Sequence, residues 1–265
     1  MHEELDAAIV AFDEETGVGE ITMNRPDALN ALSAQLRSDI VTGLRMLEEQ
    51  NEGAEGVALR AVILEGAGDR AFCAGADITE FSDMSPADTM DRNHYEVIRD
   101  FPSPIIAKVQ GYCLGGGFET ALSADFRFAS EDSTFGFPEV DLGFLPGAGG
   151  ASMVNQLAGP GVAKELAMTG EHIPAGRAAD EGLVHGVFPA EDLDDEVADF
   201  AETIAGKAPL AVQGIKQSVD HAVQVGMEEG IEFDGEKAAL LARTEDFAEG
   251  TAAFAEKREP EFRGK

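Results

Sequence analysis

Tryptophan is absent from the 265-residue chain, and tyrosine and cysteine occur only twice each. The two cysteines, Cys73 and Cys113, show no C-x-x-C spacing, which argues against a disulfide framework and against a zinc ribbon. No run of about 18 apolar residues occurs, so the sequence predicts no membrane-spanning helix. Residues 1–6 lack the basic and apolar segments of a secretory signal, and we therefore expect a cytoplasmic protein in a reducing compartment.

Basic side chains are also scarce. The chain has 19 lysine and arginine residues against 51 aspartate and glutamate residues, and its formal net charge is −32. A surface of this sign repels nucleic-acid phosphates and anionic lipid heads, so we expect neither nucleic acid nor membrane as a partner. The acid excess is typical of proteins that work in molar salt, where the Debye length falls to about 3 Å. A merely acidic protein that works at low salt is the alternative.

The apolar pattern predicts an α/β fold with parallel strand pairing, because strands alternate with helices along most of the chain. The expected elements are strands at 7–12 and 18–23, a helix from Ser33 to about Gln50, strands at 61–64 and 105–109, a polar helix at 87–99, a short helix at 115–122, and strands at 126–129 and 134–137. Beyond about residue 191 only helical patterns occur, the last of them at 247–262. We therefore predict a core at 1–195 and a helical region at 196–265, which is too small to be stable without docking or oligomerisation.

Three glycines, at 115–117, open the short helix. Glycine lets a ligand approach the backbone, and the N–H groups of a first helical turn point along the positive end of the helix dipole. The loop at 72–78 consists mainly of small residues and follows a buried strand, so it can supply another backbone N–H. Two such donors that converge on one oxygen form an oxyanion hole, worth about 3 kcal/mol per donor. The alternative is that the glycines only allow tight packing of helix on strand.

Two other glycine motifs have simpler explanations. The segment 147–150 begins like a dinucleotide-binding loop, but Ser152 occupies the sixth position of G-x-G-x-x-G, and we interpret it as a structural turn. The segment 111–115 has the shape of a nucleophile elbow with Cys113 in place of serine. No histidine stands in a recognisable context for a base, so we predict that Cys113 is a small buried side chain.

Among the many carboxylates, Glu119 and Glu139 are candidates for chemistry. Glu119 lies in the first turn of the glycine-opened helix beside apolar residues, and Glu139 follows an apolar strand end. Apolar surroundings raise a carboxyl pKa, whereas a helix N-terminus favours the ionised form. Such environments can separate an acid from a base. A carboxylate pair is also typical of glycosidases, but the chain has little aromatic surface on which a sugar could stack.

Ordered motifs over nearly the whole chain resemble those of the enoyl-CoA hydratase/isomerase (crotonase) superfamily. No single motif is decisive, whereas their order and spacing together are specific. The matching segments are Asn24-Arg25-Pro26 with 28–32, then 71–78, 111–117, 135–139, 142–150 and 252–258.

The resemblance implies a spiral of ββα units, a C-terminal helical trimerisation region and a homotrimer or dimer of trimers. It also implies a small-molecule acyl-CoA substrate whose thioester oxygen accepts hydrogen bonds from the N–H groups of Ala76 and Gly116. No metal and no cofactor is expected, because coenzyme A is part of the substrate. The substrate-binding residues implied by the resemblance are Ala28, Ala74, Ala76, Asp77, Ile78, Thr79, Gly116, Phe254 and Lys257.

Hydratases of this family carry both carboxylates, so the resemblance favours hydration of a trans-2-enoyl-CoA to 3-hydroxyacyl-CoA, as in fatty-acid β-oxidation. It implies that Glu119 orients a water and helps to remove its proton while the water attacks Cβ, and that Glu139 delivers a proton to Cα. Two alternatives stay open. One is a double-bond isomerase or another acyl-CoA lyase of the superfamily, and the other is a non-catalytic protein that binds CoA thioesters.

The chain departs from the family pattern at three places. Thr79 stands where many relatives have a lysine, and Asp27 stands where some have one; both positions lie near where relatives hold the adenine and phosphate groups of the coenzyme. Residues 151–153 read Ala-Ser-Met in place of the common Thr-Gln-Arg. Arg25, Lys257 and Arg258 are the candidates to replace the missing cationic contacts. These departures leave the acyl range open.

Overall fold

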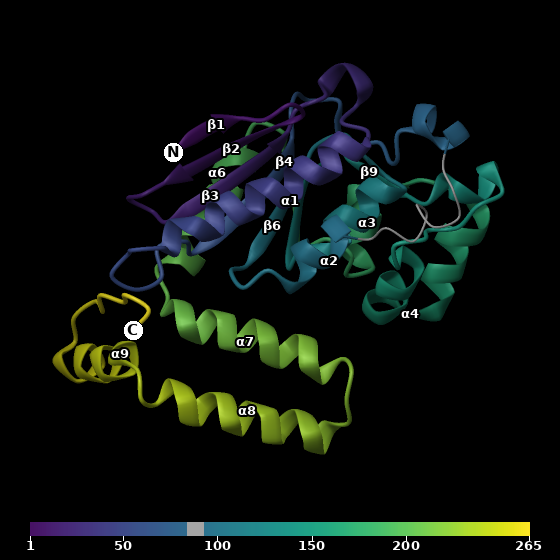
Figure 1. Cartoon of the computed structure of the whole chain (residues 1–265). Helices are drawn as coiled ribbons and strands as arrows, with labels where there is room; N and C mark the ends of the chain where they lie inside the picture. The colour runs from purple at the N-terminus through teal and green to yellow at the C-terminus, as the bar shows by residue number, and fades with distance from the viewer. Residues whose placement is uncertain (84–92) are drawn as a thin grey trace.

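The computed structural model of the chain describes residues 1–83 and 93–265 (Figure 1). The strands are β1 (His2–Glu4), β2 (Ala8–Asp13), β3 (Val18–Met23), β4 (Ala61–Gly66), β5 (Ala71–Cys73), β6 (Ile105–Val109), β7 (Tyr112–Leu114), β8 (Phe126–Ser130), β9 (Thr134–Gly136), β10 (Ile173–Pro174) and β11 (Gly186–Phe188). The α-helices are α1 (Ala34–Glu48), α2 (Asn93–Asp100), α3 (Gly116–Ser123), α4 (Gly150–Thr169), α5 (Ala175–Asp180), α6 (Leu193–Ala205), α7 (Pro209–Ala222), α8 (Met227–Leu241) and α9 (Glu245–Glu256). The 3-10 turns are η1 (Pro26–Ala28), η2 (Glu49–Asn51), η3 (Ile78–Asp83) and η5 (Pro138–Leu142).

The strands form two sheets. The larger sheet has the order β1-β2-β3-β4-β6-β8-β11, and the smaller has the order β10-β9-β7-β5. Strands β1 to β3 pair antiparallel, whereas β3, β4, β6, β8 and β11 run parallel. From β4 to β9, consecutive strands alternate between the two sheets, and a helix follows each pair. This is a spiral of ββα units, so the predicted fold and its parallel pairing are confirmed.

Local sequence signals explain the larger elements. The Ser33 hydroxyl accepts a hydrogen bond from Leu36 N at 3.1 Å and caps α1. Helix α1 then buries Leu36 and Ile40 in the main core, on the side that faces β2 and β3. Helix α6 covers the larger sheet too, and its Leu193 packs with Ile106 in a second, smaller core. The central parallel strands are therefore covered by apolar side chains, as their continuous apolar sequence requires.

Helices α7, α8 and α9 lie apart from the sheets, and α7 and α8 run antiparallel beside each other (Figure 1). The last residues turn back toward the core. Arg263 O accepts a hydrogen bond from Val57 N at 2.9 Å, while the carboxylate of Asp246 accepts from the N–H groups of Arg263 and Gly264, each at 2.8 Å. The C-terminal tail thus ties α9 to the loop before β4. The predicted boundary at 195/196 falls inside α6, and the division into domains stays a prediction.

The structure differs from the sequence predictions in several elements. Helix α9 ends at Glu256, where Lys257 adopts a left-handed φ of 56°, so the predicted helix at 247–262 is too long. Of the predicted helix at 87–99, residues 93–99 lie in α2 and 87–92 lie outside the described residues. Sequence patterns found the short strand β9 but missed others, such as β5 and β7. In the described part of the chain, none of the helices combines the length and apolar character that crossing a bilayer demands.

Candidate active site

Glycines bring α3 very close to the small sheet. Gly115, with φ of 51°, leads from β7 into α3. A Cβ atom built on Gly117 would lie only 2.1 Å from the carbonyl oxygen of Cys73. No larger residue fits there without a shift of the backbone. The packing explanation of these glycines therefore holds at Gly117, and the same close approach brings the first turn of α3 beside the loop that follows β5.

Two backbone amides lie side by side at this junction. A Cβ built on Gly116 would lie 3.6 Å from the nitrogen of Ala76. Leu32 holds the loop of Ala76 in place, because Leu32 N donates to Gly75 O at 2.8 Å and Leu32 O accepts from Asp77 N at 3.1 Å. Across residues 1–83 and 93–265, neither the Ala76 nor the Gly116 N–H donates to a protein group. Two neighbouring donors of this kind are what an oxyanion hole requires.

Glu119 is buried in the first turn of α3, with only 3% of its surface exposed. Its Oε1 accepts hydrogen bonds from Ala148 N at 2.8 Å and from Gly150 N at 2.9 Å. A Cβ on Gly150 would lie 2.9 Å from Glu119 Cγ, so glycine is needed at that position. The 147–150 segment is a turn, as predicted, but its N–H groups also fix the orientation of the Glu119 carboxylate, which the sequence analysis missed.

Glu139 approaches the same end of α3 from η5. Its Oε1 would lie 3.1 Å from a Cβ on Gly115, the residue that caps α3. Its Oε2 is buried, and within the described residues this oxygen has no hydrogen-bond partner. Burial raises the pKa of Glu139 above its usual value. The two candidate carboxylates therefore reach the N-terminal end of one helix, but they differ in their hydrogen bonds. Glu119 Oε1 accepts two from backbone N–H groups, whereas Glu139 Oε2 accepts none within the described residues.

Aromatic rings form the apolar floor below this site. Phe118 of α3 stacks on Phe137 with ring centroids 4.9 Å apart and lies 5.2 Å from Phe135 of β9. All three side chains are fully buried. They anchor α3 and the start of η5 to the same part of the core, which holds Glu119 and Glu139 on one side of the molecule.

Several of the predicted substrate-binding residues gather around η1 and the loop after β5. Ala74 N donates to Leu29 O at 3.0 Å, next to Ala28 at the end of η1. Arg25 donates to the Asp77 carboxylate at 2.9 Å, and Thr79 donates to the same group. These bonds lower the pKa of Asp77. Arg25 therefore holds this loop in addition to any contact with a coenzyme.

Ile78 begins η3 on the same loop, and its side chain is 64% exposed. An apolar side chain this exposed offers contact surface to a ligand. The loop thus combines a largely covered carboxylate at Asp77, paired with Arg25, with an exposed apolar side chain at Ile78.

Phe254 and Lys257 do not join this group within one chain. Both belong to the α9 region, which lies at the far end of the molecule from α3 and α4 (Figure 1). Phe254 is 88% exposed. Arg258 is engaged in ion pairs with Glu249 and Glu256. The predicted substrate contacts of Phe254 and Lys257 therefore require a neighbouring subunit and stay a prediction.

Both cysteines are free thiols in the protein interior. Cys73 and Cys113 are completely buried, and burial raises the pKa of Cys73 to about 12. The Cys113 thiol lies 3.7 Å from Gly117 O, and its pKa is also raised by burial. A thiol held in its neutral form is a poor nucleophile. The prediction that Cys113 is a small buried side chain is confirmed.

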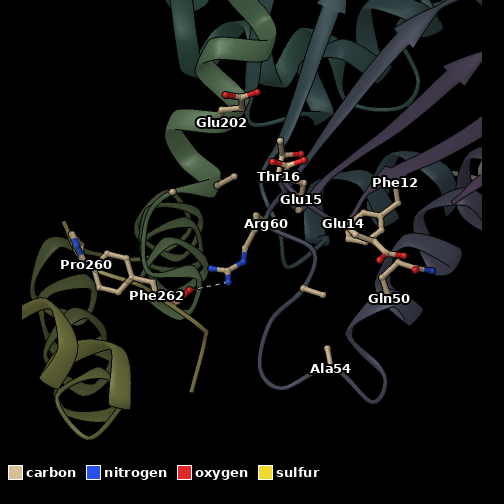
Figure 2. Close-up of a pocket in the computed structure, with 14 residues that line it drawn as sticks. Phe12, Glu14, Glu15, Thr16, Gln50, Ala54, Arg60, Glu202, Pro260 and Phe262 are labelled. Carbon is tan, nitrogen blue, oxygen red and sulfur yellow. Dashed lines mark hydrogen bonds between the residues drawn. The ribbon is translucent and has the colours of Figure 1, made fainter.

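A cavity of about 680 Å³ lies away from this site, between the β2–β3 hairpin, α6 and the C-terminal tail (Figure 2). Arg60 crosses it and donates to Phe262 O at 3.0 Å. Its rim includes the carboxylates of Glu14, Glu15 and Glu202. None of the predicted catalytic or substrate-binding residues lines it.

The chain is similar to known proteins over nearly its whole length. The pattern of the family described as enoyl-CoA hydratase/isomerase matches residues 13–265. The short-chain-enoyl-CoA hydratase of Clostridium acetobutylicum is 35% identical over 257 residues, covering 95% of this chain and 96% of the relative. The 2,3-dehydroadipyl-CoA hydratase of Escherichia coli is 35% identical over 248 residues, covering 92% and 94%. A solved enoyl-CoA hydratase from Bacillus anthracis superposes with a TM-score of 0.89 at 36% identity, covering 97% of this chain and 99% of that one. The chain belongs to the enoyl-CoA hydratase/isomerase family.

Proposed function

We propose that this protein is an enoyl-CoA hydratase, a hydro-lyase that adds water reversibly to the trans-2 double bond of an enoyl-CoA thioester. The observation that carries the proposal is that Glu119 and Glu139 meet at the N-terminal end of α3, where the amide of Gly116 lies beside the amide of Ala76 from the loop after β5. Hydration needs these two parts together, because a nucleophilic water, a proton donor and a site for transient negative charge must act on one substrate.

In the proposed reaction the thioester oxygen accepts hydrogen bonds from the N–H groups of Ala76 and Gly116. Attack of water on Cβ moves electrons toward this oxygen, which then carries enolate-like negative charge. The donors are held in place by the Leu32 bridge and by α3, so little reorganisation is needed as the charge develops. Preorganised donors of this kind lower the barrier by about 3 kcal/mol each.

The two carboxylates divide the proton transfers. Glu119, whose Oε1 is bound by two backbone N–H groups, orients the water and takes up its proton. Glu139, whose buried carboxyl has a raised pKa, delivers a proton to Cα. One bond from the water oxygen to Cβ and one C–H bond at Cα form, while one O–H bond of the water and the π bond between Cα and Cβ break. The proton that Glu119 takes up is replaced on Glu139 through solvent, which restores both carboxyl groups for the next turnover. This scheme uses only groups of the chain and the substrate, so it calls for no metal or separate cofactor.

We also propose that the chain works in the cytoplasm as a homotrimer or a dimer of trimers that assembles through α7 to α9. Apolar side chains exposed on these helices support an interface there, since large apolar side chains in contact with water favour association. They are Ile215, Val219, Val223, Met227, Ile231, Leu240, Phe247 and Phe254. Light scattering of the purified protein tests this, and a monomer at micromolar concentration would refute it.

The activity is tested with purified protein and trans-2-butenoyl-CoA. We expect rapid loss of the conjugated-thioester absorbance and formation of 3-hydroxybutyryl-CoA, identified by mass spectrometry. A parallel reaction with 3-enoyl-CoA distinguishes an isomerase, which would convert it to the conjugated form faster than it hydrates the 2-enoyl substrate. A series of acyl chain lengths defines the substrate range. If the protein binds enoyl thioesters but turns over none of these substrates, the proposal is wrong and the chain is a binding protein.

A further inference from the structure

Tyr95 places a hydroxyl group next to the paired amides. Tyr95 lies on α2 and is 9% exposed. A Cβ built on Gly116 would be 2.9 Å from its hydroxyl oxygen, 3.2 Å from Leu32 Cδ1 and 3.6 Å from Ala76 N. The phenol oxygen, the loop of Ala76 and the first turn of α3 thus surround one point. No local pattern singles out Tyr95, because α2 is a polar helix and only the fold brings it against α3.

Neighbouring side chains fix the position of the Tyr95 ring. The ring of His94 lies 3.7 Å from it between centroids. His94 Nε2 lies 3.5 Å from the hydroxyl of Thr120, which donates to Gly116 O at 2.8 Å. Burial lowers the pKa of His94 to about 3, so this histidine stays neutral near pH 7. Helix α2 is therefore connected through His94 and Thr120 to the same residue, Gly116, that the Tyr95 hydroxyl faces.

The Tyr95 hydroxyl keeps its proton at any working pH. Burial, and after it the charge of Glu119, raise the pKa of Tyr95 well above its usual value, and Glu139 acts in the same direction. Among residues 1–83 and 93–265 this hydroxyl has no hydrogen-bond partner, and unlike Glu139 Oε2 it is not fully enclosed by protein atoms. The hydroxyl of a tyrosine whose ring is buried usually finds a hydrogen-bond partner. A bound ligand can supply that partner.

We propose that the Tyr95 hydroxyl donates a third hydrogen bond to the thioester oxygen of bound enoyl-CoA, beside the N–H groups of Ala76 and Gly116. The inference rests on the hydratase function proposed above. Tyr95 keeps its proton throughout, so it takes no part in the proton transfers of Glu119 and Glu139. Its bond strengthens as negative charge builds on the oxygen, and it acts on the transition state more than on substrate binding.

The variant Tyr95→Phe removes only the hydroxyl, and Tyr112→Phe is the matched control. Tyr112 is the other tyrosine of the chain and lies 46% exposed on β7. We expect Tyr95→Phe to lower kcat on trans-2-butenoyl-CoA about 10- to 100-fold with little change of KM, since loss of one oxyanion donor acts mainly on kcat. Tyr112→Phe should keep the wild-type rate.

A spectroscopic probe shows whether the Tyr95 hydroxyl donates a hydrogen bond to the thioester oxygen. A cinnamoyl-CoA with an electron-donating ring substituent absorbs at longer wavelength when its carbonyl is polarised. Wild-type protein and Tyr112→Phe should shift this band equally, and Tyr95→Phe should shift it less. An unchanged shift in Tyr95→Phe would overturn the inference even if kcat fell, because the hydroxyl would then act on the water. If the wild-type protein neither hydrates enoyl-CoA nor shifts the band, the proposed function itself fails.

A second measurement does not depend on the folding of Tyr95→Phe. Because the chain has only two tyrosines, biosynthetic incorporation of fluorotyrosine into Tyr112→Phe protein modifies Tyr95 alone. The more acidic phenol is a stronger donor and should enlarge the shift of the bound cinnamoyl thioester. A shift equal to that of unlabelled Tyr112→Phe protein would contradict a bond from Tyr95 to the thioester oxygen.

Discussion

Replacing Glu139 by glutamine should slow hydration and at the same time stabilise the fold. The wild-type carboxyl has a buried Oε2 without a hydrogen-bond partner among the described residues, and burial raises its pKa. The folded protein therefore favours the protonated form, and ionisation of this poorly solvated carboxyl costs stability. Glutamine resembles the protonated form and removes that cost. We expect a gain of about 1 kcal/mol in the free energy of unfolding, or about 2–4 °C in Tm.

The sign of this effect depends on pH. Because the folded-state pKa of Glu139 is raised, its contribution to stability is complete at low pH, where the carboxyl is protonated, and is lost as pH rises through that pKa. The advantage of Glu139→Gln over wild type should therefore grow with rising pH and vanish at acidic pH. Activity should fall about 10²- to 10⁴-fold at every pH, because glutamine cannot deliver a proton to Cα.

Glu119→Gln is the informative contrast. It should lose activity to a similar extent, but it should also destabilise the protein by about 1 kcal/mol, because a neutral amide oxygen accepts the bonds from Ala148 N and Gly150 N less strongly than a carboxylate does. Glu131→Gln, at an exposed position, is the control for loss of one negative charge. Turnover of trans-2-butenoyl-CoA and urea unfolding measure the two effects. A Glu139→Gln protein with the wild-type rate, or one less stable than Glu119→Gln, would refute this assignment of roles.

Three further predictions concern stability away from the site. Burial and Glu65 raise the pKa of Glu20 to about 7, so its contribution to stability is present at acidic pH and lost as pH rises through about 7. The free energy of unfolding of the wild type should therefore fall between about pH 5 and about pH 8, and Glu20→Gln should reduce this fall by about 1 kcal/mol, a modest value because the site is partly open to solvent. If urea unfolding gives the same fall for Glu20→Gln and wild type, the prediction is wrong. Asp246→Ala should destabilise the protein by about 1–3 kcal/mol, because two backbone N–H groups of the tail lose their acceptor, and hydrogen exchange should become faster at Arg263 and Gly264. Molar KCl should raise Tm by screening the net charge of −32, whereas a maximum of stability and activity at low salt would exclude salt adaptation.

Local sequence signals were sufficient for the elements that bury a continuous face. Helix α1 follows from the Ser33 cap and from the spacing of its apolar residues, and β4 and β6 follow from compact apolar runs. The strands β5 and β7 have three residues each and too little pattern to be found locally. They form because β7 lies between β5 and β9 in the smaller sheet, with Cys113 in register with Cys73 of β5 and with Phe135 of β9. Such strand pairing depends on residues that are distant in the sequence.

The amino-acid order alone identifies the groups available for chemistry: the glycines at 115–117, the small residues at 72–78, and the two carboxylates Glu119 and Glu139. Their contacts with one another arise from the fold. It brings the N–H groups of the 147–150 turn, which are 29 and 31 residues away, to Glu119. It also turns Tyr95 from a polar helix toward Gly116. These contacts depend on packing distances of a few ångströms between segments that the spiral of two sheets brings together, and no local pattern encodes such distances.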